Sequence, residues 1–405
     1  MDIFRSSLAR AATGFKALAL AGAMFAAHAS AQSQDIKLGF VGDMTASPTA
    51  GVGIAGVAGI EAAIEDINKA GGLLGRKLSL IVRDDQGQPA RSIQGVTELI
   101  DSEKVVALFG PSNSGNAMAW KRIPNEKKVP VMVVIAEATD VTKPMTPDGE
   151  NYMFRDTMYD RAQTAALTAY AKKNGAKKVG LITETTGYGE GGLRDLQVQA
   201  KAAGLDVVAA EKIAVADTDM TSQLTKLKAA GVDTVLAWCQ GTPMGLLLRS
   251  MEKLNYFPTL LSAGGATTNS FYDAAGPALA SKAISVRTIW APVTEPQQKL
   301  FKRVEGKLTN PVVFYGSVQA YDGVMLLAAA IRQAGSVEGL KVREALENLQ
   351  APVQGIFKSY DKPFSRANHE ALVPSDARFV RWNNGKVGEY TDAVTKSLTA
   401  AELNR

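Results

Sequence analysis

The sequence predicts an α/β protein made of two doubly wound lobes. Strand-type and helix-type segments alternate along the chain, and the alternation begins anew near residue 161. The chain has 405 residues, whereas a single hydrophobic core stops growing at roughly 250 to 300 residues. We therefore expect two Rossmann-like lobes, each with a mainly parallel sheet between helices.

The first 31 residues have the features of a secretory leader and are set apart from the fold. Arg5, Arg10 and Lys16 precede an apolar run at 17–27, and small residues lead up to Ala31. This run is shorter than the roughly 20 apolar residues that span a membrane. We expect export with cleavage near Ala31 rather than membrane anchoring.

The first lobe follows directly in the sequence. Short β-branched runs predict buried strands, and apolar residues at helical spacing, such as Ile60, Ile64 and Ile67, predict helices. The predicted segments are strand 36–41, helix 56–69, strand 77–82, helix 91–102, strand 105–109, a helix to about 122 and strand 129–135. The Gly/Ala-rich stretch 51–56 is expected to be a loop.

The second lobe repeats this order, and the chain then leaves it. The predicted segments are helix 161–174, strand 178–185, helix 191–203, strand 205–213, helix 221–230, strand 233–239, helix 243–254 and strand 259–262. Three later helices, at 295–308, 318–334 and 342–349, have no strands of their own. They must pack on an existing sheet, so we expect the chain to return to lobe one. A strand at 377–382 and a turn at 383–385 follow.

Two loops at predicted strand ends are the candidate binding site. Ligands of open α/β sheets bind at the carboxyl ends of strands. The loop 110–115 (GPSNSG) offers the hydroxyls of Ser112 and Ser114 before a helix, and helix N-termini attract anions. An ordinary helix cap explains the same residues equally well. The loop 136–139 (AEAT) follows the next strand, so the two loops are expected side by side.

Composition excludes several classes of function. The single cysteine, Cys239, rules out an internal disulfide, and outside the leader only His369 is available for acid–base chemistry. A site of several histidines cannot be built, and we expect no metal and no cofactor. The net charge of +5 falls to +3 when Arg5, Arg10, Lys16 and Asp2 of the leader are removed, which is too mild to indicate nucleic-acid binding. An enzyme would need Cys239 or His369, which are more typical of a core thiol and of a surface or hinge residue.

The chain resembles the leucine/isoleucine/valine-binding family of periplasmic receptors over nearly its whole length. The matching stretches are 36–42 (IKLGFVG), 59–75 (GIEAAIEDINKAGGLLG), 83–85 (RDD), 110–114 (GPSNS), 187–191 (GYGEG) and 320–322 (AYD). The resemblance implies a type I periplasmic binding protein fold with three hinge crossovers and closure of the lobes on a ligand. It implies a periplasmic monomer that binds a small molecule, without catalysis, for an inner-membrane ABC permease. A sensor subunit of the same fold stays open as an alternative.

Roles for individual residues come from the same resemblance. Ser114 is similar to the serine that binds the ligand carboxylate, and Thr139, beside Ala138, to the threonine that helps to hold it. Glu137 lies where the family uses a backbone carbonyl. Tyr188 is similar to the aromatic residue that covers the ligand; the alternative, a loop tyrosine that packs on its own lobe, stays open. The implied boundaries are lobe one at 32–157 and 291–368, and lobe two at 158–290 and 369–405.

The sequence also departs from the family. Amino-acid receptors present an acid from lobe two to the ligand ammonium, and here 262–266, around Gly264, contains none. An unpaired buried ammonium costs several kcal/mol. Either Glu137, Glu184 or Asp156 replaces that acid, or the ligand is an aromatic or other organic acid or an amide. The family has tyrosines at the positions that correspond to Val52 and to 240–242, and this sequence has none there. Trp238, next to 240–242, either fills the space of the missing lobe-two tyrosine or belongs to the core.

Overall fold

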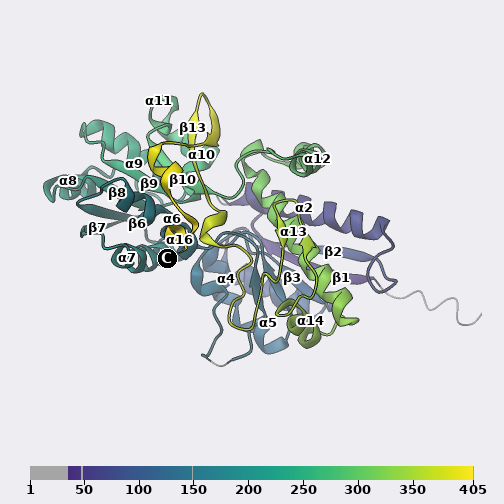
Figure 1. The fold of residues 1–405 in the computed structure, drawn as a ribbon. Helices are drawn as coiled ribbons and strands as arrows, with labels where there is room; N and C mark the ends of the chain where they lie inside the picture. Colours follow the sequence, from purple (N-terminus) through teal and green to yellow (C-terminus); the bar gives the residue numbers. More distant parts are fainter. Residues whose placement is uncertain (1–34, 47–48, 148, 405) are drawn as a thin grey trace, which may run out of the picture.

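The computed structural model describes residues 35–46, 49–147 and 149–404 (Figure 1). The leader predicted in residues 1–31 lies outside the described residues. Two bodies lie side by side, one holding β1 to β3 and the other β6 to β10 (Figure 1). The predicted two-lobed α/β fold is confirmed.

The first sheet has five parallel strands in the order β2-β1-β3-β4-β5. They are β1 (Ile36–Gly42), β2 (Leu78–Asp84), β3 (Ala107–Phe109), β4 (Val131–Val133) and β5 (Met153–Arg155). The helices between them are α2 (Ala50–Lys69), α3 (Pro89–Asp101), α4 (Ser114–Trp120) and α5 (Arg122–Lys127). Strand β5 was not predicted, because a strand of three residues is too short to show a recognisable hydrophobic pattern.

The second sheet has the order β14-β13-β10-β9-β8-β6-β7. Five strands are parallel: β6 (Val179–Glu184), β7 (Val207–Ile213), β8 (Thr234–Trp238), β9 (Thr259–Ser262) and β10 (Ala283–Arg287). The antiparallel hairpin of β13 (Arg378–Asn383) and β14 (Lys386–Glu389) extends it. Its turn has positive φ at Asn384 (48°) and Gly385 (75°), as a tight hairpin turn requires. The helices are α6 (Asp160–Lys173), α7 (Gly187–Ala202), α8 (Thr221–Ala229), α9 (Gly241–Lys253), α10 (Asn269–Ala275) and α11 (Pro277–Ala280).

The later helices return to lobe one, as predicted. They are α12 (Glu295–Val304), α13 (Phe314–Ala334) and α14 (Gly339–Leu346), followed by a small hairpin of β11 (Val353–Gln354) and β12 (Ser359–Tyr360). Helix α13 packs on α2, where the Ser317 hydroxyl donates to the Ala55 carbonyl at 2.7 Å. By length and hydropathy the segment Pro311–Ala334 could cross a membrane, but 78% of its apolar window is buried in this core.

The chain therefore passes between the lobes three times: after β5, after β10 and after β12. The third passage runs beside β5, since the Arg155 amide donates to the His369 carbonyl at 2.9 Å and the Ala371 amide donates to the Arg155 carbonyl at 2.8 Å. His369 is 5% exposed. It is thus a buried hinge residue, and the surface alternative is wrong. The chain ends with two short helices, α15 (Ala393–Ser397) and α16 (Ala400–Leu403), which pack against α6.

The start of α2 corrects the sequence analysis. Residues 51–56 were predicted as a loop, but they belong to helix α2, which begins at Ala50. Glycine disfavours helices, but here it allows close packing: a Cβ on Gly53 would lie 1.9 Å from the Asp43 carbonyl oxygen. Tertiary packing outweighs the local preference, and it places Val52 on the side of lobe one that faces lobe two.

Candidate functional site

A cavity of about 110 Å³ lies between the two lobes. Its walls come from the carboxyl ends of strands in both sheets, where ligands of such sheets bind. Lobe one contributes Thr49, Val52, Ser112, Asn113, Ser114, Ile135, Ala136, Glu137 and Tyr315; lobe two contributes Tyr188, Gln240, Gly241, Gly264, Gly265, Thr268, Ser270 and Arg287. A single water needs roughly 10 to 15 Å³ of such space, so the cavity has room for a small solute.

The predicted site residues divide into two groups. Ser112, Ser114, Glu137, Tyr188 and Gly264 line the cavity. Ala138, Thr139 and Trp238 lie behind its wall and are not part of its lining. Direct contact of each of these residues with a ligand stays a prediction.

The loop after β3 combines a helix cap with two anchored serines. Asn113 caps α4 by accepting a hydrogen bond from the Asn116 amide at 2.9 Å, which accounts for the capping alternative. The Ser112 hydroxyl accepts from the Asp43 amide at 3.0 Å, and the Ser114 hydroxyl accepts from the Ala138 amide at 3.1 Å. Among the described residues, the Ser114 hydroxyl donates to no protein acceptor, so its proton can serve a ligand in the cavity.

Thr139 faces the other lobe rather than the cavity. Its hydroxyl donates to the Asp195 carboxylate and accepts from the Arg161 amide at 2.9 Å. Asp195 also accepts from the Arg161 guanidinium at 2.7 and 2.9 Å. Next to it Arg194 pairs with Asp140 at 2.9 Å, again across the lobes. These contacts hold the lobes together beside the cavity.

Among the three acids considered, Glu137 lies at the cavity. Gln163 donates to its carboxylate at 3.0 Å. Burial raises the Glu137 pKa, and Arg287 is the main opposing influence. Glu184 instead accepts from the amide and the side chain of Gln240, at 2.7 and 2.9 Å. Glu137 is therefore the acid that can face a ligand.

The third acid, Asp156, is fully buried away from the cavity lining. Neither of its carboxylate oxygens has a hydrogen-bond partner among the described residues. Burial, and then the neighbouring Asp322, raises its pKa well above the ordinary value. Asp156 thus lies outside the cavity lining, so among the acids considered it is the one least placed to meet a ligand there.

Arg287, at the end of β10, is a charged site residue that the sequence analysis missed. It is 8% exposed. Its Nε donates to the Thr267 hydroxyl at 2.7 Å, and its Nη2 donates to the Gly264 carbonyl at 2.8 Å. The guanidinium lies 4.0 Å from the ring centre of Tyr315. The signal that could have found it is the run 283–287 (AISVR), a β-branched segment with a cation where a strand would end.

Gly264 explains how a guanidinium fits there. A Cβ at this position would lie 2.8 Å from the Arg287 Cζ, so only glycine permits this approach without displacement. Glu137 and Arg287 both line a second cavity of about 10 Å³, close to the volume that one water molecule needs. The two side chains form no direct ion pair within the part of the chain that the structure describes.

Tyr188 and Trp238 form an aromatic pair in lobe two. Their ring centres are 5.8 Å apart at 38°, with Tyr188 at the cavity and Trp238 fully buried behind it. A Cβ on Gly192 would lie 2.1 Å from the Trp238 ring. Trp238 is thus a core residue, as one of the two alternatives stated, and its indole packs against Tyr188 and does not line the cavity.

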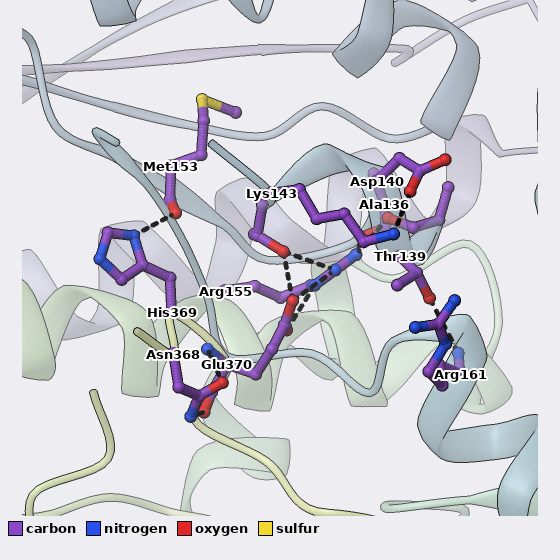
Figure 2. A network of polar contacts seen from close by, with 12 residues as sticks. Ala136, Thr139, Asp140, Lys143, Met153, Arg155, Arg161, Asn368, His369 and Glu370 are labelled. Carbon is purple, nitrogen blue, oxygen red and sulfur yellow. Dashed lines mark hydrogen bonds and ion pairs between the residues drawn. The ribbon is translucent and has the colours of Figure 1, made fainter. Parts of the chain in front are cut away.

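A buried ion pair supports the loop 136–139 from behind (Figure 2). Arg155 Nη1 donates to the carbonyls of Ala136 and Ala138, both at 3.0 Å. Its Nε and Nη2 donate to the two carboxylate oxygens of Glu370 at 2.8 and 2.7 Å. Glu370 belongs to the third passage between the lobes, so this pair connects the cavity wall to the hinge.

Neither Cys239 nor His369 lines the cavity. Cys239 is fully buried in the core of lobe two, where burial raises its thiol pKa well above the ordinary value. His369 stacks on Phe154 with ring centres 3.9 Å apart, and its Nδ1 lies 2.9 Å from the Met153 carbonyl oxygen (Figure 2). Both residues therefore have structural surroundings rather than those of a nucleophile or a general base.

Comparisons with known proteins agree with this architecture. Residues 35–386 match a family model described as periplasmic binding protein. A Leu/Ile/Val-binding protein homolog 7 of Brucella abortus is 26% identical over 94% of this chain and 97% of its own. A type 1 periplasmic binding protein from Bordetella pertussis superposes with a TM-score of 0.76 at 25% identity, over 88% of this chain and 99% of its own. The LivJ substrate-binding protein of Streptococcus pneumoniae, solved with isoleucine, has a TM-score of 0.72 at 25% identity, over 87% and 97%.

Proposed function

Because the chain belongs to the periplasmic binding protein family, we propose that it is the substrate-binding protein of an ABC importer. In this proposal it captures a small carboxylate-bearing solute by hinge closure and delivers it to an inner-membrane permease, without catalysing a reaction. It would act in the periplasm after removal of the leader near Ala31. The relative solved with isoleucine makes a branched-chain amino acid one candidate. An organic acid or amide without an ammonium group is the other.

One observation carries the proposal: a solute-sized cavity whose polar groups come from both lobes. Ser112 and Ser114 reach it from lobe one, and Arg287 reaches it from lobe two. A ligand that touches both lobes favours their closure, because it binds the closed form more tightly than the open one. In the closed form, the contacts of Thr139 with Asp195 and of Asp140 with Arg194 add to the stability of the closure.

A ligand screen on the chain from residue 32 onward tests this proposal. Thermal shifts would be recorded with amino acids and with aliphatic and aromatic carboxylates. A ligand at about 100 times its Kd stabilises the folded protein by roughly 2.7 kcal/mol, which a melting curve resolves. If no small carboxylate or amino acid raises the melting temperature, the proposed function is wrong.

Two substitutions test the lobe-one side of the cavity with the ligand that the screen identifies. Ser114→Ala removes a hydroxyl at the cavity, and Thr139→Ala removes the hydroxyl that joins the lobes. Each should weaken binding about 10-fold, the worth of a hydrogen bond to a charged group. Ser102→Ala, at an exposed position after α3, is the matched control and should bind as the wild type does. Unchanged affinity in both variants would remove the lobe-one carboxylate site.

A further inference from the structure

Arg287 is a buried cation that has no counter-charge in direct contact among the residues that the structure describes. Buried charges in proteins are normally paired, since an isolated one is costly. Arg155 follows this rule through its ion pair with Glu370. Arg287 has two neutral acceptors, the Thr267 hydroxyl and the Gly264 carbonyl, and no ion pair with a described carboxylate.

The surroundings of Arg287 hold its guanidinium in one orientation at the cavity wall. Two hydrogen bonds fix its Nε and Nη2 on one side, and the Tyr315 ring covers one face at 4.0 Å. A guanidinium has five N–H donors, so the Nη1 group and one Nη2 proton remain beyond these two bonds. Because Arg287 lines the cavity, donors of this kind at its lobe-two wall are suited to bind an anion.

Glu137 is the acid in the cavity lining that could neutralise Arg287, and its position argues against a direct pair. It reaches the cavity from lobe one and accepts a bond from Gln163. Both residues line a separate cavity of about 10 Å³. Burial raises the pKa of Glu137, and Arg287 opposes this rise. No ion pair joins the two side chains among the described residues, so Arg287 stands at the lobe-two wall without a paired carboxylate.

We infer that Arg287 determines which class of solute this protein takes: it pairs with a ligand carboxylate, so the ligand is an organic acid without an ammonium group facing lobe two. This inference rests on the proposed function and narrows it. Tyr188, Tyr315 and Ile135 provide aromatic and apolar walls for the body of such an acid. An α-amino acid whose ammonium faced this wall would instead meet a buried cation.

The test compares acids that differ only in the ammonium group. Isothermal titration would measure binding of 4-methylpentanoate against leucine, and of 3-phenylpropanoate against phenylalanine. The uncharged 4-methylpentanamide tests the carboxylate itself. We expect the wild type to bind at least one of the two acids more tightly than its amino-acid partner and than the amide.

Arg287→Met then tests the residue, because methionine keeps the length and removes the charge. Loss of one partner of a buried charge pair should weaken acid binding at least about 30-fold. The unliganded variant should melt at the same temperature as the wild type or higher, since an unpaired buried charge is removed. Arg249→Met, at an exposed lobe-two position, is the control and should bind unchanged.

The outcomes separate the two proposals. Equal acid binding by the wild type and by Arg287→Met would overturn the role of Arg287 and leave the receptor function standing. Tighter binding of leucine or phenylalanine than of the matching acids would also overturn it. Binding of none of the probes, together with a negative carboxylate and amino-acid screen, would refute the receptor function and this inference together.

Discussion

Replacing Glu370 with glutamine should destabilise the protein more than any exposed charge substitution. The Arg155 side chain is 0% exposed and that of Glu370 is 11% exposed. Arg155 donates two charge-assisted hydrogen bonds to this carboxylate, at 2.8 and 2.7 Å. Glutamine keeps one acceptor, presents an NH₂ group to the guanidinium in place of the other, and removes the counter-charge. Breaking a buried pair costs about 3 to 5 kcal/mol, and the retained acceptor places Glu370→Gln near about 3 kcal/mol.

Urea denaturation followed by circular dichroism measures this loss as a fall in the free energy of unfolding. Glu126→Gln is the matched control, because its pair with Arg122 is 56% and 75% exposed on the two sides. Exposed helix pairs contribute about 0.3 to 0.5 kcal/mol, so the control should change little. A loss below about 1 kcal/mol for Glu370→Gln would refute the argument that this pair stabilises the hinge.

Three further substitutions test the core, the buried acid and the lobe contact. Gly192→Ala should cost roughly 1 to 3 kcal/mol in urea denaturation, because its Cβ would lie 2.1 Å from Trp238, whereas Gly388→Ala, with open space around it, should cost under about 0.5 kcal/mol. The pKa of Asp156 is raised in the folded state, so the free energy of unfolding of the wild type falls as the pH rises above about 4 toward that pKa. Asp156→Asn should therefore be as stable as the wild type in acid and more stable by about 1 kcal/mol or more at pH 8. Parallel profiles of stability against pH for the two proteins would contradict this. Asp195→Asn should weaken ligand binding about 10-fold in titration calorimetry, because it loosens a contact made across the lobes, and unchanged affinity would show that this contact does not favour closure.

The periodicity of the sequence was enough to predict most of the fold. Buried parallel strands are apolar throughout and helices are amphipathic, so strands such as β6 and β8 were located to within two residues. The three-residue strand β5 was missed, and with it the place where Arg155 meets the third passage. The first turn and a half of α2 was predicted as a loop, because its glycines disfavour a helix until α13 packs on it.

The site was predictable where it follows directly from strand ends and not where it depends on a partner far away in the chain. Ser114 and Glu137 were found because each follows a recognisable strand. Arg287 was not, because β10 itself was not recognised. The ligand contact expected of Thr139 stays a prediction, and its hydroxyl partners Asp195 and Arg161 were not predicted, because they come from the other lobe.

The sequence by itself determined the two lobes, the return of the late helices to lobe one, and the strand-end loops that could bind a solute. These follow from hydrophobic period and from the rule that parallel strands end at one edge of a sheet. Only the tertiary structure decided which side chains line the cavity. It brings the Arg287 cation beside Gly264, where relatives of this fold would be expected to present an acid, and it turns Thr139 and Trp238 away from the cavity. Local sequence cannot encode that choice, because it depends on how two separately formed sheets meet.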